Sequence, residues 1–282
     1  MIKKETLDGI RIIAADLDGT LLDADGMLSP RTEGALIRAQ EKGFHIVAST
    51  GRALHTIPDF IKKTRGMTFM VTGNGARIVR LPSEETIYES LMTKEDTARI
   101  MPWISDKSYL VEVFSEGKVY IDQRCMDDLA GFGITSPWSQ HYRRTTRIPV
   151  PDCIDIVRKA PDRIENVNIM IADEERRLEI AAQLEKLPGL NIVSSAAHNI
   201  AIGSCRTSKA EGLRFTAGLY GLGLENIIAF GDSTNDREMI AKCGIGVAMG
   251  NAADEVKKAA DLVALPNTED GVARMLEELL GI

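Results

Sequence analysis

Short apolar runs that alternate with helical segments occupy both ends of the chain and restrict its fold more than any other feature. The run at 10–15 is continuously apolar, as in strands buried on both faces of a parallel sheet. A helix is predicted over 30–42, because Ser29 can cap it and Pro30 suits its first turn. The same signals predict strands at 44–48, 67–71, 226–230, 245–248 and 262–264, and helices at 53–63, 207–220, 235–242, 252–259 and 270–280, with Pro58 weakening the first of these. Strands separated by helices indicate an α/β fold with a parallel sheet covered on both faces.

The middle of the chain follows a different pattern. The runs at 109–114 and 118–121 flank Ser115-Glu116-Gly117, which is a hairpin signal, and a helix is predicted over 174–187. Adjacent strands of this kind indicate a separate α+β unit. We therefore expect a core formed by residues 1–82 and 191–282, with an α+β domain inserted at 83–190.

Length, charge and cysteine content exclude several classes of protein. The 282 residues suffice for two units, and the net charge of −7 disfavours broad binding to nucleic acid or to an anionic membrane. No apolar run approaches the roughly 20 residues that cross a bilayer. The four cysteines form no CxxC pair, so we expect free thiols in a reducing cytoplasm.

The first chemical motif, Asp16-Leu17-Asp18-Gly19-Thr20, directly follows the strand predicted at 10–15. Residues two apart in a strand point to the same side, so Asp16 and Asp18 can face one site beyond its carboxyl end. In open α/β sheets ligands bind at that edge. Two neighbouring carboxylates invite a cation or separate their pKa values.

The second motif, Ser49-Thr50-Gly51-Arg52, lies at the end of the next predicted strand. A hydroxyl and backbone N–H groups at a helix start can hold a phosphoryl oxygen. An ordinary helix cap explains the motif about as well.

A lysine and an acidic cluster complete the set. Lys209 falls in the first turn of a predicted helix, where the helix dipole disfavours a cation unless an anion or acidic groups offset it. Gly231-Asp232-Ser233-Thr234-Asn235-Asp236 follows another apolar strand, and its oxygen ligands suit Mg²⁺. An ordinary exposed lysine and a helix-capping Asp236 stay open as alternatives. Phosphoryl transfer needs a nucleophile, a cation and donors around the phosphoryl oxygens, and the four motifs supply all three.

Together these motifs resemble those of the haloacid dehalogenase-like phosphatases, most closely the Cof-type subgroup of class IIB, which carries a large α+β cap. Further likeness lies in Thr72-Gly73-Asn74-Gly75-Ala76, in the segment 244–252 and in the segment 267–272. The pair Ser233-Thr234 departs from the smaller or acidic residues common in the family. The resemblance covers nearly the whole chain and implies a Rossmann-like core with an inserted cap.

The resemblance also implies catalytic roles. Asp16 would attack phosphorus and form an aspartyl phosphate, and Asp18 would protonate the leaving alcohol and then activate water. Thr50 and Lys209 would bind the phosphoryl oxygens, and Lys209 would also restrain Asp16.

Metal and substrate contacts follow from the same likeness. Mg²⁺ would be bound by Asp16, the backbone carbonyl of Asp18 and Asp232, with Asn235 and Asp236 beside it, directly or through other ligands. Substrate contacts would come from Thr50, Gly51, Arg52, Asn74 and Lys209.

The cap would close over the site and supply the leaving-group pocket. Its basic stretch 141–147 is predicted to be a solvated surface, although contact with an acidic or aromatic substrate stays open. His45, His55 and His198 are expected to be structural. The implied partner is a small phosphorylated molecule, with no nucleic acid or membrane, and the chain is expected to be a monomer or a weak homodimer.

Three functions remain compatible with the residues. The first is a Mg²⁺-dependent phosphatase of a sugar phosphate or a similar phosphomonoester. The second is a phosphotransferase or phosphosugar mutase that uses the same nucleophile, and the third is a non-enzymatic phosphoacceptor or binding module. Asp18 argues against a stable phosphoacceptor, because an acid/base group would shorten the life of the phosphoryl bond.

Overall fold

The computed structural model describes residues 2–194 and 198–282 and divides the chain into two compact units. The core unit comprises Met1–Gly51, Pro58–Tyr88 and Ser208–Ile282. The cap unit comprises Arg52–Ile57 and Glu89–Thr207. The division differs from the one expected at 83 and 190, because the chain after residue 190 first completes the sheet of the cap unit.

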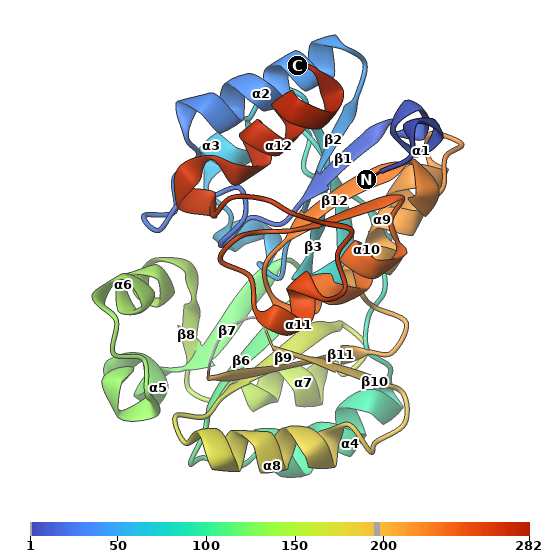
Figure 1. The fold of residues 1–282 in the computed structure, drawn as a ribbon. Coiled ribbons are helices and arrows are strands. Elements are labelled where there is room, and N and C mark those ends of the chain that lie inside the picture. The colour runs from blue at the N-terminus through green and yellow to red at the C-terminus, as the bar shows by residue number, and fades with distance from the viewer. Residues whose placement is uncertain (1, 195–197) are drawn as a thin grey trace. The chain divides into compact units, whose positions relative to one another are not determined.

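The core unit is built on one sheet in the order β14-β13-β12-β1-β2-β3-β4-β5, whose strands β12, β1, β2 and β3 are labelled in Figure 1. Every described pairing from β14 to β3 is parallel, and β4 is antiparallel to β3. The strands are β1 (Ile12–Ala15), β2 (His45–Ser49), β3 (Met67–Thr72), β4 (Arg77–Arg80), β5 (Glu85–Glu89), β12 (Ile227–Gly231), β13 (Ile245–Ala248) and β14 (Leu262–Val263). The α/β fold with a helix-covered parallel sheet is confirmed, while the antiparallel strand β4 and the edge strand β5 were not predicted.

Helices cover both faces of this sheet. Helices α2 and α12 lie side by side on one face, where Arg38 and Glu277 form an ion pair of 3.0 Å, and α9 and α10 pack on the other (Figure 1). The core helices are α1 (Lys4–Gly9), α2 (Pro30–Glu41), α3 (Asp59–Lys62), α9 (Lys209–Gly218), α10 (Arg237–Lys242), α11 (Asp254–Lys257) and α12 (Gly271–Leu280). After β1 the chain adds strands toward one edge of the sheet, and after β12 it adds strands toward the other edge. Because each crossover is right-handed, the two sets of helices lie on opposite faces.

Two local predictions in the core unit have clear outcomes. Ser29 caps α2 by accepting the N–H of Thr32, as its hydroxyl and the following proline indicate. The single helix predicted over 53–63 is wrong. A 3-10 turn at Leu54–Thr56 and the short helix α3 replace it, because Pro58 lacks the N–H that a continuous helix needs.

The cap unit has its own sheet in the order β10-β11-β9-β6-β7-β8. Its described pairings are antiparallel apart from β7 with β8. The strands are β6 (Leu110–Ser115), β7 (Lys118–Asp122), β8 (Ile148–Val150), β9 (Ile164–Met170), β10 (Leu190–Val193) and β11 (Asn199–Ser204), and the helices are α4 (Lys94–Ile104), α5 (Gln123–Asp127), α6 (Pro137–Thr146), α7 (Ile154–Lys159) and α8 (Glu174–Leu184). The hairpin predicted from Ser115-Glu116-Gly117 is confirmed as β6–β7.

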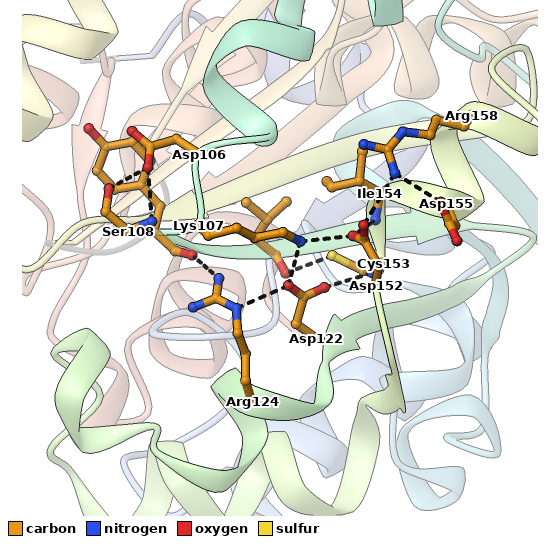
Figure 2. Close-up of polar contacts among 12 residues, drawn as sticks. Asp106, Lys107, Ser108, Asp122, Arg124, Asp152, Cys153, Ile154, Asp155 and Arg158 are labelled. Atoms are coloured by element: carbon orange, nitrogen blue, oxygen red, sulfur yellow. Dashed lines mark hydrogen bonds and ion pairs between the residues drawn. The ribbon is translucent and has the colours of Figure 1, made fainter.

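A buried aspartate at the end of β7 joins separate segments of the cap unit. Asp122 accepts a hydrogen bond from the backbone N–H of Cys153. It also forms an ion pair of 2.8 Å with Lys107, and the Lys107 ammonium contacts Asp152 at 2.9 Å (Figure 2). Arg124 contacts the same carboxylate of Asp122 at 3.3 Å. These donors satisfy a carboxylate that would be costly to bury alone, so the network fixes the start of α7 against β7.

The basic stretch 141–147 is only partly the solvated surface that the sequence favours. Arg143 and Arg147 instead lie against Glu112, a fully buried carboxylate of β6, at 3.0 and 2.9 Å. Burial alone would raise the pKa of Glu112, but Arg147 and Arg143 outweigh burial and lower it to about 2. His141 and Arg144 on the other side of α6 are exposed.

Glu112→Gln is expected to destabilise the protein at neutral pH. The lowered pKa in the folded state corresponds to stabilisation on the order of 3 kcal/mol, which is complete above the unfolded-state pKa and disappears as the pH falls toward 2. Urea unfolding at pH 7 and at pH 3 should therefore show a difference between wild type and variant that shrinks at the lower pH. Glu179→Gln, which removes an exposed partner of Arg176, should change stability by about 0.5 kcal/mol or less. A difference for Glu112→Gln that grows on acidification would contradict this assignment.

Tyr142 of α6 is the centre of a group of aromatic and cationic contacts. The Tyr142 hydroxyl donates to Thr56 Oγ1 at 3.2 Å, and the guanidinium carbons of Arg52 and Arg147 lie 4.8 and 4.7 Å from the Tyr142 ring centroid. Trp138 stacks on the same ring, with 5.3 Å between centroids. These contacts attach the segment Arg52–Ile57 to the cap unit.

Other expectations concern histidine, cysteine and the membrane. His45 stacks on Tyr220 at 3.6 Å, and burial lowers its pKa, as suits a structural residue. All four cysteines are free, as expected, and Cys205 is the exposed one. Among the described residues, no helix combines the length and apolar character needed to span a bilayer.

Candidate active site

The acidic motifs meet because their strands are neighbours. Strands β1 and β12 pair in parallel with Ala15 opposite Phe230, so the chain leaves both strands at the same edge of the sheet. The N–H of Asp16 continues the ladder by donating to the Phe230 carbonyl at 3.0 Å. Asp16 and the Asp232–Asp236 segment therefore lie next to each other at the carboxyl ends of the two central strands.

A buried lysine joins two of these acids. Lys209 Nζ donates to Asp16 Oδ1 at 2.7 Å and to Asp236 Oδ1 at 2.6 Å. Lys209 and Asp236 are fully buried, and Asp16 is nearly so. Lys209 is the first residue of α9, and Ser208 caps that helix by accepting the N–H of Glu211. The two carboxylates thus offset the unfavourable position of a cation at a helix start.

Burial and mutual repulsion determine the ionisation of this cluster. Burial alone would lower the pKa of Lys209, but Asp16 and Asp236 overcome burial and raise it above its ordinary value. Burial also raises the pKa of Asp16, with Lys209 opposing and Asp236 adding to the rise. Burial and Asp236 raise the pKa of Asp232 to about 6. Lys209 carries one positive charge, which is too little to neutralise Asp16, Asp232 and Asp236 together.

Backbone and hydroxyl donors orient the acids further. Asp236 Oδ2 accepts the N–H groups of Asp232 and Ser233, each at 3.0 Å. Asp232 Oδ1 accepts the Thr20 hydroxyl, and its Oδ2 accepts the Ser233 hydroxyl, both at 3.1 Å. With Lys209 on its other oxygen, Asp236 is held on both sides, whereas Asp232 accepts one hydroxyl group on each oxygen.

Gly19 allows the first motif to approach the fourth. Its φ of +80° is a conformation that side-chain-bearing residues rarely adopt, and a Cβ there would lie 2.6 Å from Asp232 Oδ2. Asn251 donates its amide to the Gly19 carbonyl at 2.9 Å. The glycine of the first motif is therefore required both for the turn and for the space beside Asp232.

The three clustered acids fit a divalent cation. Asp16, Asp232 and Asp236 each offer a carboxylate oxygen, and these oxygens lie within 4.8 Å of one another. Three carboxylates face one ammonium group, so a bound cation would balance the remaining charge and favour the ionised acids. Carboxylate oxygens are the ligands that hard cations such as Mg²⁺ prefer.

Other residues predicted for the site lie in different surroundings. Asp18 is exposed and is not part of the three-acid cluster. Thr50 is buried, donates its N–H to the Val71 carbonyl at 2.8 Å and accepts the N–H of Asn74 at 3.0 Å. Arg52 follows Gly51 in the chain but groups with the cap unit through Tyr142.

Asn74 and Asn235, predicted for substrate and metal respectively, contact each other. Asn235 Nδ2 donates to Asn74 Oδ1 at 2.9 Å. Each residue belongs to a separate motif in the sequence, and the core unit brings both together.

Sequence reasoning missed the roles of two supporting residues. Thr20 holds Asp232, and Asn251 holds the turn at Gly19. Both belong to motifs that were noted, but only the contacts reveal which acid or carbonyl each one serves. A hydroxyl two residues after Asp18 was the available signal for Thr20.

An α/β core with a lysine-linked acid cluster at the ends of its central strands, interrupted by an α+β unit, defines a class of hydrolases that act on phosphate esters. The chain belongs to the haloacid dehalogenase-like hydrolase family, whose model matches residues 13–276. Within that family it is a Cof-type member, and it is a phosphomonoester hydrolase.

Individual relatives are similar over nearly their full length. The phosphatase YwpJ of Bacillus subtilis is 30% identical over 286 residues, covering 96% of this chain and 100% of that protein. The 5-amino-6-(5-phospho-D-ribitylamino)uracil phosphatase YcsE of Bacillus subtilis is 30% identical, covering 98% and 97%. The solved structure of a haloacid dehalogenase-like hydrolase from B. subtilis has a TM-score of 0.83 at 30% identity and covers 96% of this chain and 100% of that one.

Proposed function

We propose that this phosphatase hydrolyses a small phosphorylated metabolite in two steps, with Asp16 as nucleophile and Mg²⁺ as cofactor. The observation that carries the proposal is the bridge from Lys209 to Asp16 and Asp236, with Asp232 completing a cluster of three acids. A nucleophilic carboxylate, a neighbouring ammonium group and a cation site are the parts that phosphoryl transfer requires.

In the first step a carboxylate oxygen of Asp16 attacks phosphorus and the bond to the ester oxygen breaks. Asp18, protonated at this stage, gives its proton to the leaving oxygen, so that an alcohol departs. The phosphoryl group is then held as an acyl phosphate on Asp16. The exposure of Asp18 supports this role, since both the leaving group and the attacking water must reach its carboxyl group.

In the second step water attacks the same phosphorus atom. Asp18, now a carboxylate, takes one proton of that water, and the bond to Asp16 breaks. The products are inorganic phosphate and the free Asp16 carboxylate, with Asp18 returned to its acid form.

Lys209 and Thr50 are assigned to the phosphoryl oxygens. Lys209 also restrains Asp16, an assignment supported by its 2.7 Å contact. Mg²⁺, held by Asp16, the Asp18 carbonyl and Asp232, would neutralise charge on the phosphoryl group in the transition state. Asp236 has its oxygens engaged by Lys209 and two N–H groups, which favours a supporting role beside the metal.

The substrate class follows from the relatives and stays broad. Because YcsE is named for a phosphorylated ribityl compound, sugar phosphates and similar phosphomonoesters are the first candidates. We assign selection among them to the cap unit. A cytoplasmic location, no nucleic-acid or membrane partner, and a monomer or weak homodimer complete the proposal.

Metal removal is expected to stop turnover. Purified protein in EDTA should hydrolyse p-nitrophenyl phosphate at least about 100-fold more slowly than with excess Mg²⁺, because the buried acids then lack their counter-charge. Nitrophenolate and inorganic phosphate should be released in equal amounts, and added Mg²⁺ should restore the rate.

The product separates hydrolysis from the alternatives. With a panel of sugar phosphates, inorganic phosphate should accumulate and rank the substrates by kcat/KM. An isomeric sugar phosphate as the product would overturn the proposal in favour of a mutase. Full activity in EDTA would overturn the metal assignment.

A further inference from the structure

We propose that Arg143 of the cap unit binds an anionic group on the leaving alcohol, so that this phosphatase prefers phosphomonoesters that carry a carboxylate or a second phosphate. The inference rests on the proposed function, because it names the class of substrate that the hydrolase takes. It is argued from residues of the cap unit, on α6, β6 and β9.

Two arginines of α6 share one carboxylate. Arg143 Nε donates to Glu112 Oε1 at 3.0 Å, while Nε and Nη2 of Arg147 donate to the two oxygens of Glu112 at 2.9 and 3.3 Å. Among the described residues, Glu112 is the only acid within 4.0 Å of either guanidinium group. The side chains of Glu112, Arg147 and Arg143 are only 1%, 7% and 12% exposed. One positive charge therefore remains without a counter-charge in largely buried surroundings, and a bound anion would neutralise it.

Arg143 has the donors that such an anion needs. The guanidinium group of Arg147 is fully used, since its Nη1 donates to Thr146 Oγ1 at 2.9 Å. Arg143 Nη2 contacts the thioether sulfur of Met170 at 3.7 Å, which is a weak acceptor, and no hydrogen bond between described residues uses its Nη1. Nη1 and Nη2 of one guanidinium group form a planar fork that matches two oxygens of a carboxylate or a phosphate.

The strands next to Arg143 add a polar group on the same face of the cap sheet. Glu112 of β6 lies directly opposite Asn168 of β9, and Met170 follows two residues later. Asn168 hydrogen-bonds Glu112, and its Oδ1 is buried without a hydrogen-bond partner. A hydroxyl group is a donor of the kind that this oxygen lacks, so a phosphorylated hydroxy acid suits these residues.

The chain connects this face of the cap sheet with a residue assigned to the phosphoryl group. Phe114 lies two residues after Glu112 in β6 and so points to the same face, where it packs with Ala53. Ala53 belongs to the segment Arg52–Ile57, which begins two residues after Thr50 in the chain. Because of this direct connection, we assign the anion to the substrate itself rather than to a separate effector.

Matched substrates measure the preference. In each pair an anionic group replaces a hydroxyl or hydroxymethyl group: 3-phosphoglycerate against glycerol 3-phosphate, gluconate 6-phosphate against glucitol 6-phosphate, and fructose 1,6-bisphosphate against fructose 6-phosphate. The first two pairs test a carboxylate at two distances, and the third tests a second phosphate. Wild type should show at least about 10-fold higher kcat/KM for the anionic member of at least one pair, because charge-assisted contacts of this kind are strong.

Two substitutions at Arg143 test its part in that preference. Arg143→Met removes the fork but leaves Glu112 paired with Arg147, so the preference should fall to about 2-fold or less, mainly through the anionic member. Arg143→Lys keeps the charge without the fork and should lower the preference at least about 3-fold; it also serves if Arg143→Met does not fold. Arg144→Met is the matched control, since Arg144 is the next residue of α6, exposed and bonded to Gln140. Its preference should equal that of wild type.

Circular dichroism establishes which variants are folded. Equal kcat/KM for both members of every pair in wild type overturns the inference, as does an undiminished preference in folded Arg143→Met or Arg143→Lys, or an equal loss in Arg144→Met. Protein that hydrolyses p-nitrophenyl phosphate with Mg²⁺ but shows no preference contradicts this inference alone. Absence of Mg²⁺-dependent turnover with every compound contradicts the proposed function as well, so the two failures are distinguishable.

Discussion

Asp16→Asn is expected to lower kcat for p-nitrophenyl phosphate by at least about 10³-fold while the protein stays folded. An amide is a poor nucleophile and cannot form the acyl phosphate, so both chemical steps lose their path. The fold should survive because Lys209 keeps its contact with Asp236, and burial had already raised the pKa of Asp16. Steady-state kinetics with circular dichroism of the same samples measures both quantities.

A trapping experiment tests the covalent step directly. Acid quench during turnover of ³²P-labelled substrate should yield label on the wild-type protein and none on Asp16→Asn. Asp8→Asn, which changes an exposed aspartate outside the cluster, should match wild type in rate and labelling. If Asp16→Asn retained full activity, another residue would have to be the nucleophile.

The second large effect is expected at Lys209. Lys209→Met should reduce kcat at least about 100-fold, because a donor to the phosphoryl group and to Asp16 is lost. In EDTA it should also lower the free energy of unfolding by about 3–5 kcal/mol, since Asp16 and Asp236 would remain buried without their cation. Urea unfolding in metal-free buffer measures this loss.

A double variant separates the two consequences of losing Lys209. Adding Asp236→Asn to Lys209→Met removes one of the stranded carboxylates, so part of the stability should return while turnover stays low. Lys242→Met, which breaks an exposed pair with Glu238, should cost about 0.5 kcal/mol or less. A Lys209→Met protein as stable as wild type would show that the cluster does not depend on this ion pair.

Much of the fold could be predicted because the strands of the core are strongly apolar and regularly spaced. The strand predicted at 245–248 is observed with the same bounds, and the run at 10–15 contains β1. The boundary of the inserted unit was harder to predict from the sequence. Strands β10 and β11 carry no local mark of the sheet they join. Strand β11 pairs with β9 and β10 pairs with β11, so their place depends on contacts between separate segments.

The charged residues of the cap unit also form contacts that the sequence did not predict. The stretch 141–147 has the composition of a solvated surface, yet Arg143 and Arg147 are largely covered, because both pair with the carboxylate of Glu112 in β6. Glu112 stands in an apolar run, and nothing in its neighbourhood along the chain indicates its partners. A long-range ion pair of this kind has no local sequence signal.

The class of fold and the residue types of the proposed site could be predicted from the sequence, because strand periodicity and the motifs around Asp16 and Asp232 are local properties. Which groups touch became visible only in the folded chain: Lys209 lies between two acids, Thr20 contacts Asp232, and Asn74 contacts Asn235. Those contacts join residues up to 212 positions apart, and they arise only when parallel strands place their carboxyl ends at one edge of the sheet.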